Sequence, residues 1–210
     1  MIPMRMSIWI VRGVSLFGAL LLAFTTMGAQ GGLSGDPLLA SLRSGGHVIV
    51  MRHASSPGQP PAKEAANPDN VTLERQLDAG GRATATAMGE ALRRLKIPIG
   101  DVLTSPTYRA RETARYAQLS NAKTQDELGD GGKSMKTATE DQGAWLRRKV
   151  DQIPRGTNSI LVTHMPNIAR AFPDVADVAD GEALVFGPDG KGGVKLVARV
   201  KIQEWPSLGK

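Results

Sequence analysis

Short apolar runs alternate with segments of helical periodicity along most of this chain. Apolar runs that fit strands cover residues 47–51, 101–104 and 159–163, and alternating residues predict two later strands over 182–186 and 194–202. Helical spacing predicts helices over residues 37–43, 81–96, 105–118 and 137–153, and another that opens at Pro166. This alternation predicts an α/β fold, a three-layer α/β/α sandwich around a mostly parallel central sheet with an antiparallel edge strand.

Turn-forming residues separate these elements. Ser105-Pro106 places a serine at a helix N-cap and a proline at the first helical position. Residues 188–192 carry the proline, aspartate and glycines of a hairpin turn. Residues 55–70, rich in Pro, Ala and Ser, predict a surface loop, and residues 119–136 predict irregular structure. The chain shows no internal repeat and no linker to a second folded domain.

The N-terminal residues 1–29 have the pattern of a secretory signal peptide. Arg5 and Arg12 form a basic segment, residues 14–24 are apolar, and Ala29 is a small residue suited to cleavage. The apolar part is shorter than the roughly 20 residues that a spanning helix needs, which favours cleavage over an uncleaved membrane anchor. The sequence therefore predicts a periplasmic or secreted protein, membrane-anchored if the segment is not cleaved. Its predicted parts are a signal peptide over 1–29, an N-terminal tether over 30–44, a domain over 45–205 and a C-terminal tail over 206–210.

Composition narrows the classes of function. The chain has 210 residues, a formal net charge of +6 and no cysteine, so disulfides, thiolate metal sites and cysteine nucleophiles are excluded. Aromatic residues make up only 4% of the chain and do not alternate with a basic stripe, which argues against nucleic acid as a partner. The modest positive charge favours a small anionic substrate instead.

Polar residues with catalytic potential stand at or beyond the ends of three predicted strands. Arg52 and His53 follow the first strand, Arg109 comes shortly after the second, and His164 follows the third. Because ligands bind beyond the carboxyl ends of strands in an open α/β sheet, we expect these side chains to converge. Guanidiniums bind phosphoryl oxygens, and an unprotonated imidazole can attack phosphorus to form a phosphohistidine. Asn167, one turn into the helix after His164, is a candidate to cap or position that histidine.

The same segments resemble the histidine phosphatase (phosphoglycerate-mutase-like) superfamily. The resemblance is carried by Met51-Arg52-His53-Ala54, by Ser105-Pro106 with Arg109-Ala110 and Thr113-Ala114, and by Val162-Thr163-His164. Their order and spacing resemble the small family members, and the match spans roughly residues 45–205. The resemblance implies the family's α/β/α core. It also implies that His53 is the nucleophile and that Arg52, Arg109 and His164 bind the phosphoryl group.

Two features depart from the family pattern. Ala54 stands where the family usually has glycine, and its methyl group crowds the phosphate only slightly. The general acid, which the family commonly places between the second arginine and the second histidine, has candidates in Asp126, Glu127 and Asp130, with Asp130 in the most family-like position. Glu182, at the start of a late strand, is a further candidate. The choice between Asp130 and Glu182 stays open, as does an enzyme without this acid that accepts only good leaving groups such as phosphohistidine.

Structural interpretations compete with functional ones at single residues. His47 stands at the start of its strand, away from the proposed site, and is interpreted as structural or exposed. The three histidines lack the clustering of a zinc site, and no G-x-S-x-G elbow surrounds Ser105. The sequence therefore predicts neither a metal site nor a serine hydrolase.

Taken together, these patterns predict an exported, metal-independent phosphatase without a cofactor, which hydrolyses phosphate monoesters through a phosphohistidine on His53. Its expected partner is a small phosphorylated substrate or a phosphorylated component of the cell envelope, with membrane contact only through an uncleaved N-terminal segment. The sequence determines neither the substrate nor the oligomeric state. The alternative is a non-catalytic anion-binding or envelope-interaction protein on a phosphatase scaffold, which Ala54 and the unidentified acid motivate.

Overall fold

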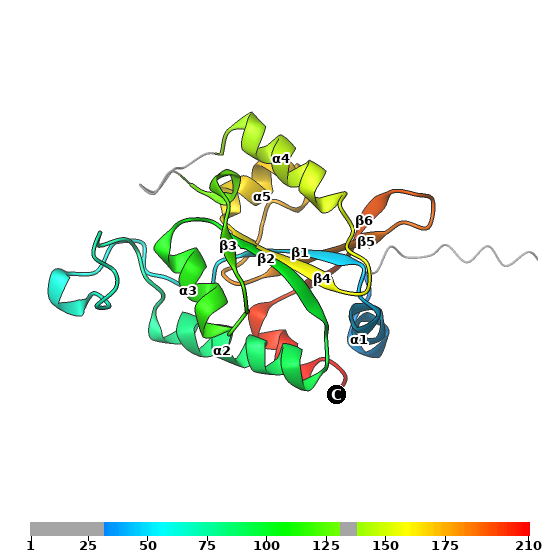
Figure 1. Ribbon diagram of the computed structural model, residues 1–210, viewed down its shortest axis with the longest axis horizontal. Coiled ribbons are helices and arrows are strands. Elements are labelled where there is room, and N and C mark those ends of the chain that lie inside the picture. The colour runs from blue at the N-terminus through cyan, green and yellow to red at the C-terminus, as the bar shows by residue number, and fades with distance from the viewer. Residues whose placement is uncertain (1–31, 131–137) are drawn as a thin grey trace, which may run out of the picture. The chain divides into compact units, whose positions relative to one another are not determined.

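A six-stranded sheet with the strand order β3-β2-β4-β1-β5-β6 lies at the centre of the computed structural model (Figure 1), which describes residues 32–130 and 138–210. The strands are β1 (His47–Arg52), β2 (Ile99–Thr104), β3 (Lys123–Thr124), β4 (Asn158–Thr163), β5 (Ala183–Pro188) and β6 (Val194–Val200). Strands β1 to β4 pair in parallel, whereas β5 runs antiparallel to both β1 and β6. The expected mostly parallel sheet is confirmed, and a hairpin of two strands forms its antiparallel edge.

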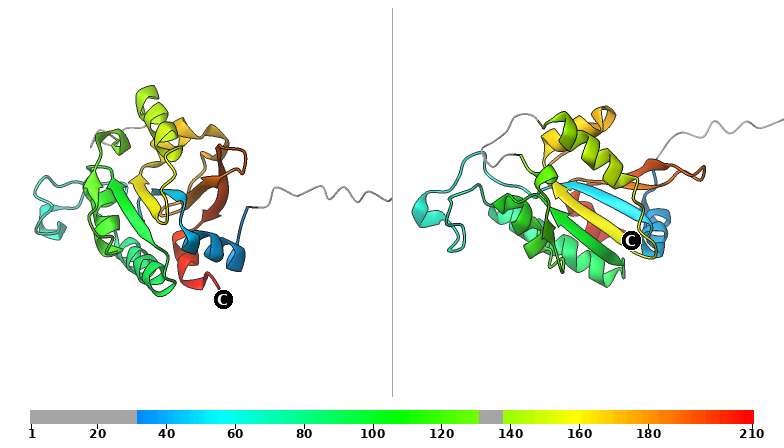
Figure 2. Two further views of the ribbon diagram at one scale, coloured as in Figure 1. Left: turned by 45° about the vertical axis from the view of Figure 1, so that its right-hand side comes forward. Right: turned by 45° about the horizontal axis from the view of Figure 1, so that its top comes forward.

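Helices cover both faces of this sheet. They are α1 (Gly35–Ser44), α2 (Ala79–Arg94), α3 (Tyr108–Tyr116), α4 (Glu140–Val150) and α5 (Met165–Ala171), with 3-10 helices at Lys63–Ala65, Asp126–Leu128, Pro173–Val175 and Ile202–Ser207. Helices α4 and α5 lie on one face, and α2 and α3 lie on the other (Figures 1 and 2). Alternate side chains of β1 serve the two cores, because Ile49 and Met51 pack with α1 and α2 while Val48 and Val50 pack with α4 and α5. The α/β/α sandwich is confirmed.

Local hydrogen bonds determine where the helices begin. Asp78 caps α2, because its Oδ1 accepts the Gly81 N–H at 2.6 Å. Helix α3, in contrast, begins at Tyr108 rather than at Pro106, so the expected N-cap at Ser105 is wrong. The Thr107 N–H donates to Ser105 Oγ at 3.2 Å, and the turn that this bond closes delays the helix and turns the Ser105 hydroxyl toward the sheet edge.

The segment after α3 contains more regular structure than its sequence predicts. Strand β3 adds two residues to the edge of the sheet beside β2, and the 3-10 helix Asp126–Leu128 follows it. Leu128 is completely buried, and its carbonyl oxygen accepts a hydrogen bond from Thr163 Oγ1 at 2.8 Å. This anchor fixes the backbone immediately before Asp130 against the end of β4.

The register of the sheet brings three strand ends to one place. Arg52 lies opposite Thr163 at the ends of β1 and β4. Backbone pairing continues one residue beyond these ends, where the His53 N–H donates to Thr163 O at 3.0 Å and the Ser105 N–H donates to Val162 O at 2.8 Å. The residues that follow β1, β2 and β4 are therefore fixed side by side before any side chain is considered.

The N-terminal region contributes one helix to the domain. Helix α1 buries Leu38, Leu39 and Leu42 in the core that it shares with α2, so it packs as an integral element. The predicted signal peptide over 1–29 lies outside the described residues. Across the described ranges, no helix is long and apolar enough to cross a membrane.

Candidate active site

His53 lies directly beyond β1 and is held in one tautomer. Its Nδ1–H donates to the Ala54 carbonyl oxygen at 2.8 Å, which leaves Nε2 without a proton in the neutral ring. Arg109 Nε–H donates to this Nε2 at 3.1 Å. The backbone beneath the ring is also fixed, because the Gly181 N–H donates to His53 O at 2.9 Å. The unprotonated nitrogen of His53 therefore faces a buried guanidinium.

Ala54, at the position where the family usually has glycine, is part of this support. Its side chain is completely buried, and its N–H donates to Thr113 Oγ1 at 3.0 Å. The Thr113 hydroxyl in turn donates to Arg109 O at 2.9 Å. This chain of bonds couples the end of β1 to the first turns of α3.

Arg109 joins the candidate catalytic side chains. While Nε–H contacts His53, the Nη2 donors reach the Asp130 carboxylate and His164 Nδ1, the latter at 3.1 Å. Arg109, His53 and His164 are each no more than 3% exposed. A guanidinium donates along fixed directions in one plane, so this single side chain sets the relative positions of three partners.

His164 follows β4 and completes the pair of imidazoles. Its Nδ1 accepts from Arg109, so Nε2 carries the proton and donates to Ser105 Oγ at 2.8 Å. The rings of His53 and His164 meet edge to face, with centroids 5.2 Å apart. Because the Ser105 hydroxyl can donate as well as accept, it allows His164 to hold its proton on either nitrogen. Ser105 is thus a site residue that the sequence presented only as a helix cap.

Asp130 is the carboxylate that the structure brings into this group. It forms an ion pair with Arg109, and its Oδ2 lies 3.6 Å from His164 Nδ1. Its side chain is buried. The preceding Gly129 carbonyl accepts a hydrogen bond from Asn167 Nδ2 at 3.0 Å, which ties this backbone to α5.

Two residues predicted for the site, Glu182 and Asn167, form hydrogen bonds outside the group around Arg109. Glu182 lies beside the end of β1 through its backbone, but its carboxylate accepts from Arg199 Nε at 2.7 Å and from the Ala179 N–H at 2.9 Å. Burial raises the pKa of Glu182, yet these hydrogen bonds outweigh burial and the pKa lies below its ordinary value. Asn167 does not contact His164 through its side chain, which donates to the Glu127 and Gly129 carbonyls. Asn167 therefore positions the Asp130 backbone rather than the histidine.

Two further arginines border the buried group. Arg52 is a quarter exposed and pairs with Asp180 at 2.6 Å. Arg75 comes from the loop between β1 and α2 and was not identified by the sequence analysis, because nothing in a loop pattern predicts which side chains return to a strand end. Its guanidinium donates to Pro57 O at 2.6 Å and to Ser56 Oγ at 2.8 Å. Burial lowers the pKa of Arg75, and the charge of Arg109 lowers it further.

Burial and positive charge keep both imidazoles neutral. Burial, and after it the neighbouring imidazole of His164 and the charges of Arg109 and Arg52, hold the pKa of His53 well below its ordinary value. Burial has the same effect on the pKa of His164, reinforced by Arg109, Arg75 and Arg52. An unprotonated imidazole surrounded by guanidiniums can attack an electrophilic phosphorus whose oxygens the guanidiniums bind.

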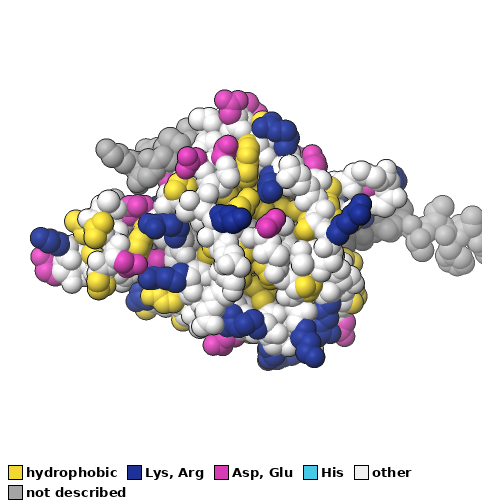
Figure 3. All heavy atoms as spheres, in the orientation of Figure 1, with side chains coloured by type: hydrophobic (Ala, Val, Ile, Leu, Met, Phe, Trp, Pro, Cys, Tyr) yellow, Lys and Arg dark blue, Asp and Glu magenta, His cyan; other side chains and the backbone are white. Residues whose placement is uncertain are grey.

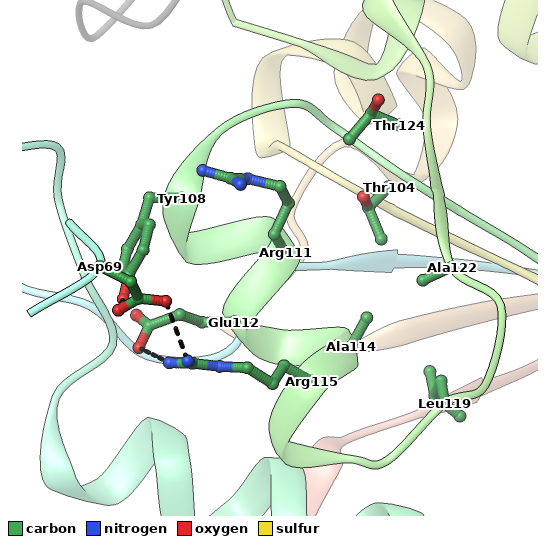
Figure 4. Close-up of a pocket in the computed structure, with 10 residues that line it drawn as sticks. All are labelled: Asp69, Thr104, Tyr108, Arg111, Glu112, Ala114, Arg115, Leu119, Ala122 and Thr124. Atoms are coloured by element: carbon green, nitrogen blue, oxygen red, sulfur yellow. Dashed lines mark hydrogen bonds and ion pairs between the residues drawn. The ribbon is translucent and has the colours of Figure 1, made fainter. Parts of the chain in front are cut away.

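Other features lie apart from this group. A cavity of about 310 Å³ borders α3 (Figure 4), lined by Asp69, Thr104, Tyr108, Arg111, Glu112, Ala114, Arg115, Leu119, Ala122 and Thr124. It contains none of the histidines. On the molecular face in Figure 3, basic and acidic side chains are interspersed. In residues 32–130 and 138–210, no three His, Asp or Glu side chains form a cluster that could hold a metal ion.

Comparison with known proteins agrees with this geometry. Residues 48–130 match the model of the histidine phosphatase superfamily (branch 1), whereas no curated protein sequence matches the chain. The solved structure of the protein histidine phosphatase SixA complexed with tungstate is 17% identical, covers 75% of this chain and 98% of its own, and superposes with a TM-score of 0.53. The phosphoserine phosphatase from Entamoeba histolytica in complex with 3-phosphoglyceric acid is 11% identical, with coverages of 76% and 98% and a TM-score of 0.51. The solved structures share the fold of this chain, and residues 48–130 are similar to the histidine phosphatase superfamily.

Proposed function

We propose that this protein is an exported phosphatase that hydrolyses phosphate monoesters through a phosphohistidine on His53. The observation that carries the proposal is the hydrogen bond from Arg109 Nε–H to the unprotonated Nε2 of His53, at 3.1 Å in a buried site. The match of residues 48–130 to the histidine phosphatase superfamily supports phosphatase activity. The nucleophile, the route through a covalent intermediate and export go further than that match.

In the first step, the Arg109 Nε–H turns from His53 Nε2 to a phosphoryl oxygen. His53 Nε2 then attacks phosphorus in line with the ester oxygen, the N–P bond forms, and the P–O bond to the leaving group breaks. Arg109 and Arg52 donate to the phosphoryl oxygens, where negative charge accumulates. His164 supports the same charge once Ser105 donates to its Nε2, because the ring then carries its proton on Nδ1, the nitrogen that faces the site. The Nδ1–H of His53, bound to Ala54 O, stabilises the positive charge that the ring acquires.

In the second step, water attacks the phosphohistidine, the N–P bond breaks, and inorganic phosphate leaves with His53 restored. The leaving oxygen of the first step needs a proton, and Asp130 is the better placed of the two candidate acids. Asp130 takes this proton from solvent when substrate displaces it from Arg109, and it regains a proton from the attacking water in the second step. Its carboxylate lies beside Arg109 and His164, whereas the carboxylate of Glu182 is directed to Arg199 and to the Ala179 N–H. We therefore assign proton donation to Asp130.

The proposed activity is metal-independent, because arginines supply the positive charge that a metal ion would otherwise bring to phosphate. Turnover should survive exhaustive chelation, and recovery that depends on added zinc or magnesium would contradict this. Export is supported by the pattern of residues 1–29 alone. It is tested by cell fractionation and by the mass of the mature N-terminus.

The nucleophile is tested by trapping the intermediate. Wild-type protein, mixed with a phosphorylated substrate and quenched within milliseconds, should carry an acid-labile, base-stable phosphoryl group that His53→Ala lacks. A generic aryl phosphate serves as substrate, because it leaves without help from an acid. If His53→Ala is folded and keeps full turnover, the assignment is wrong. If wild type binds phosphate but turns over no phosphorylated compound, the protein is instead an anion-binding scaffold.

The acid is tested by comparing alkyl and aryl substrates. General acid catalysis is typically worth about 10²–10⁴-fold, so Asp130→Asn should lose far more alkyl-phosphate than aryl-phosphate turnover. Glu182→Gln is the matched variant, and it should affect the two substrates equally. Equal effects from both variants would mean that neither residue donates the proton.

A further inference from the structure

The Asp130 carboxylate lies where the proposed function needs a phosphoryl oxygen. It pairs with Arg109 and lies 3.6 Å from His164 Nδ1 through the same oxygen, Oδ2. Arg109 and His164 are the two buried groups that bind the phosphoryl group in the mechanism above. A carboxylate oxygen and a phosphoryl oxygen accept hydrogen bonds from a guanidinium in the same way.

The Nε–H and Nη2 donors of Arg109 already have hydrogen-bond acceptors within the protein. Nε–H contacts His53 Nε2, and Nη2 contacts both Asp130 and His164. The hydrogen bond to His53 also occupies the lone pair with which that residue attacks phosphorus. The arrangement thus engages two of the three guanidinium nitrogens of Arg109 together with the nucleophile.

We infer that Asp130 acts as an internal anion that occupies the phosphoryl position in the resting protein and that phosphate must displace. This inference rests on the proposed function. A phosphate group that entered beside an ionised Asp130 would face a like charge in a buried site, where such repulsion is strong. Displacement moves the Asp130 side chain away from Arg109, while the Gly129 carbonyl stays bound to Asn167.

The pairing also gives Asp130 a second purpose, because a buried arginine without a partner is costly. The carboxylate therefore stabilises the buried guanidinium of Arg109. It also weakens the binding of phosphate, including the inorganic phosphate that the reaction produces. Proton donation and displacement are separable properties of this residue. The ratio of alkyl to aryl turnover reports proton donation, whereas the affinity for phosphate reports displacement.

Isothermal titration with inorganic phosphate tests the inference. Asp130→Asn, which removes the charge and keeps the shape, should bind phosphate about tenfold more tightly than wild type. The matched control is Asp126→Asn, which removes one negative charge from an exposed position in the same segment. Its phosphate affinity should stay within about twofold of wild type.

A second readout keeps the test decisive if Asp130→Asn is poorly folded. Asp130→Ser should melt at a lower temperature than wild type without phosphate and gain more from added phosphate, because binding then replaces the missing partner of Arg109. Equal or weaker phosphate affinity in both Asp130 variants would overturn the inference. If wild type and all variants neither bind phosphate nor turn over substrate, the phosphatase proposal itself fails.

Discussion

Strand β1 carries a buried histidine at each end, and the two have different neighbours. His47, at the amino end, is 4% exposed, and His53, beyond the carboxyl end, is 3% exposed. The ring of His47 contacts Asn158 Oδ1 at 3.1 Å and Ser41 Oγ at 3.0 Å, which are both neutral. The ring of His53 contacts Arg109, through which it joins His164 and Asp130.

This comparison shows that burial alone does not mark a functional histidine. Burial lowers the pKa of both residues, so both imidazoles are neutral at neutral pH. Only at the carboxyl end do guanidiniums adjoin the ring, and only there can added negative charge be stabilised. At the amino end, neutral partners satisfy both nitrogens of His47 and join α1 to β1 and β4.

The largest expected difference is between alanine variants at the two ends. His53→Ala should reduce kcat by about 10³-fold or more, because the nucleophile is lost. His47→Ala should keep kcat but lower the free energy of unfolding by about 1–3 kcal/mol, since Asn158 and Ser41 lose a buried partner. Steady-state kinetics and urea unfolding measure both quantities. A catalytic loss in His47→Ala that stability does not explain would break the comparison.

Arg109→Lys should have the next largest effect. Lysine keeps the charge but cannot contact His53, His164 and Asp130 at once, because it lacks the planar fork of donors. We expect kcat/KM to fall by about 10²-fold. Arg93→Lys is the control, because Arg93 donates to the Ala117 carbonyl at the C-terminal end of α3 and contacts none of the site residues. Comparable turnover in Arg109→Lys and wild type would show that charge alone suffices at this position.

Most of the contrast between His47 and His53 could be predicted from the sequence, because it depends on the register in which β1 and β4 pair. Apolar runs predicted β1 and β4, and parallel pairing of the two runs places His53 and His164 side by side. The roles of Ser105 and Arg75 could not be predicted in this way. Ser105 reaches His164 because a turn delays the start of α3, and Arg75 lies in a loop whose path depends on contacts distant in sequence. Glu182 directly precedes β5, one residue before the strand begins, and its partner Arg199 lies on β6, so this contact depends on the hairpin.

The pH dependence of activity should separate the two histidines further. Attack requires neutral His53, and the pKa of this residue is held well below 6.5 by burial and the adjacent positive groups. We therefore expect kcat/KM of wild type to stay level as pH falls to 6.5 and to decline only below it, by about tenfold per pH unit. A decline centred at or above pH 6.5 would contradict the lowered pKa. His47→Ala should leave this profile unchanged.

The free energy of unfolding should depend on pH because of the same lowered histidine pKa values. A histidine with a lowered pKa binds fewer protons in the folded state than in the unfolded state, between its folded pKa and about 6.5. Its contribution is thus complete above pH 6.5 and is lost as pH falls through this window, by at most about 1.4 kcal/mol per pH unit for each proton. His53→Ala should flatten this slope in urea unfolding between pH 6.5 and 5. An unchanged slope would show that His53 binds protons equally in the folded and unfolded states, which would contradict its lowered pKa.

The smallest expected effect concerns the loop arginine. Arg75 lies at the border of the site, where its charge acts on His164 and Arg109 without a direct contact. Arg75→Gln should raise KM for a phosphorylated substrate by about three- to tenfold with little change in kcat, because a rim charge attracts the substrate but does not enter the transition state. The matched control is Arg155→Gln, an exposed residue that precedes β4 at the opposite end of the sheet. Since both variants remove one positive charge, an equal rise in KM would reflect net charge alone. A rise in KM that is confined to Arg75→Gln and shrinks with added salt would show that a positive charge in the loop after β1 helps to attract the substrate to the carboxyl end of the sheet.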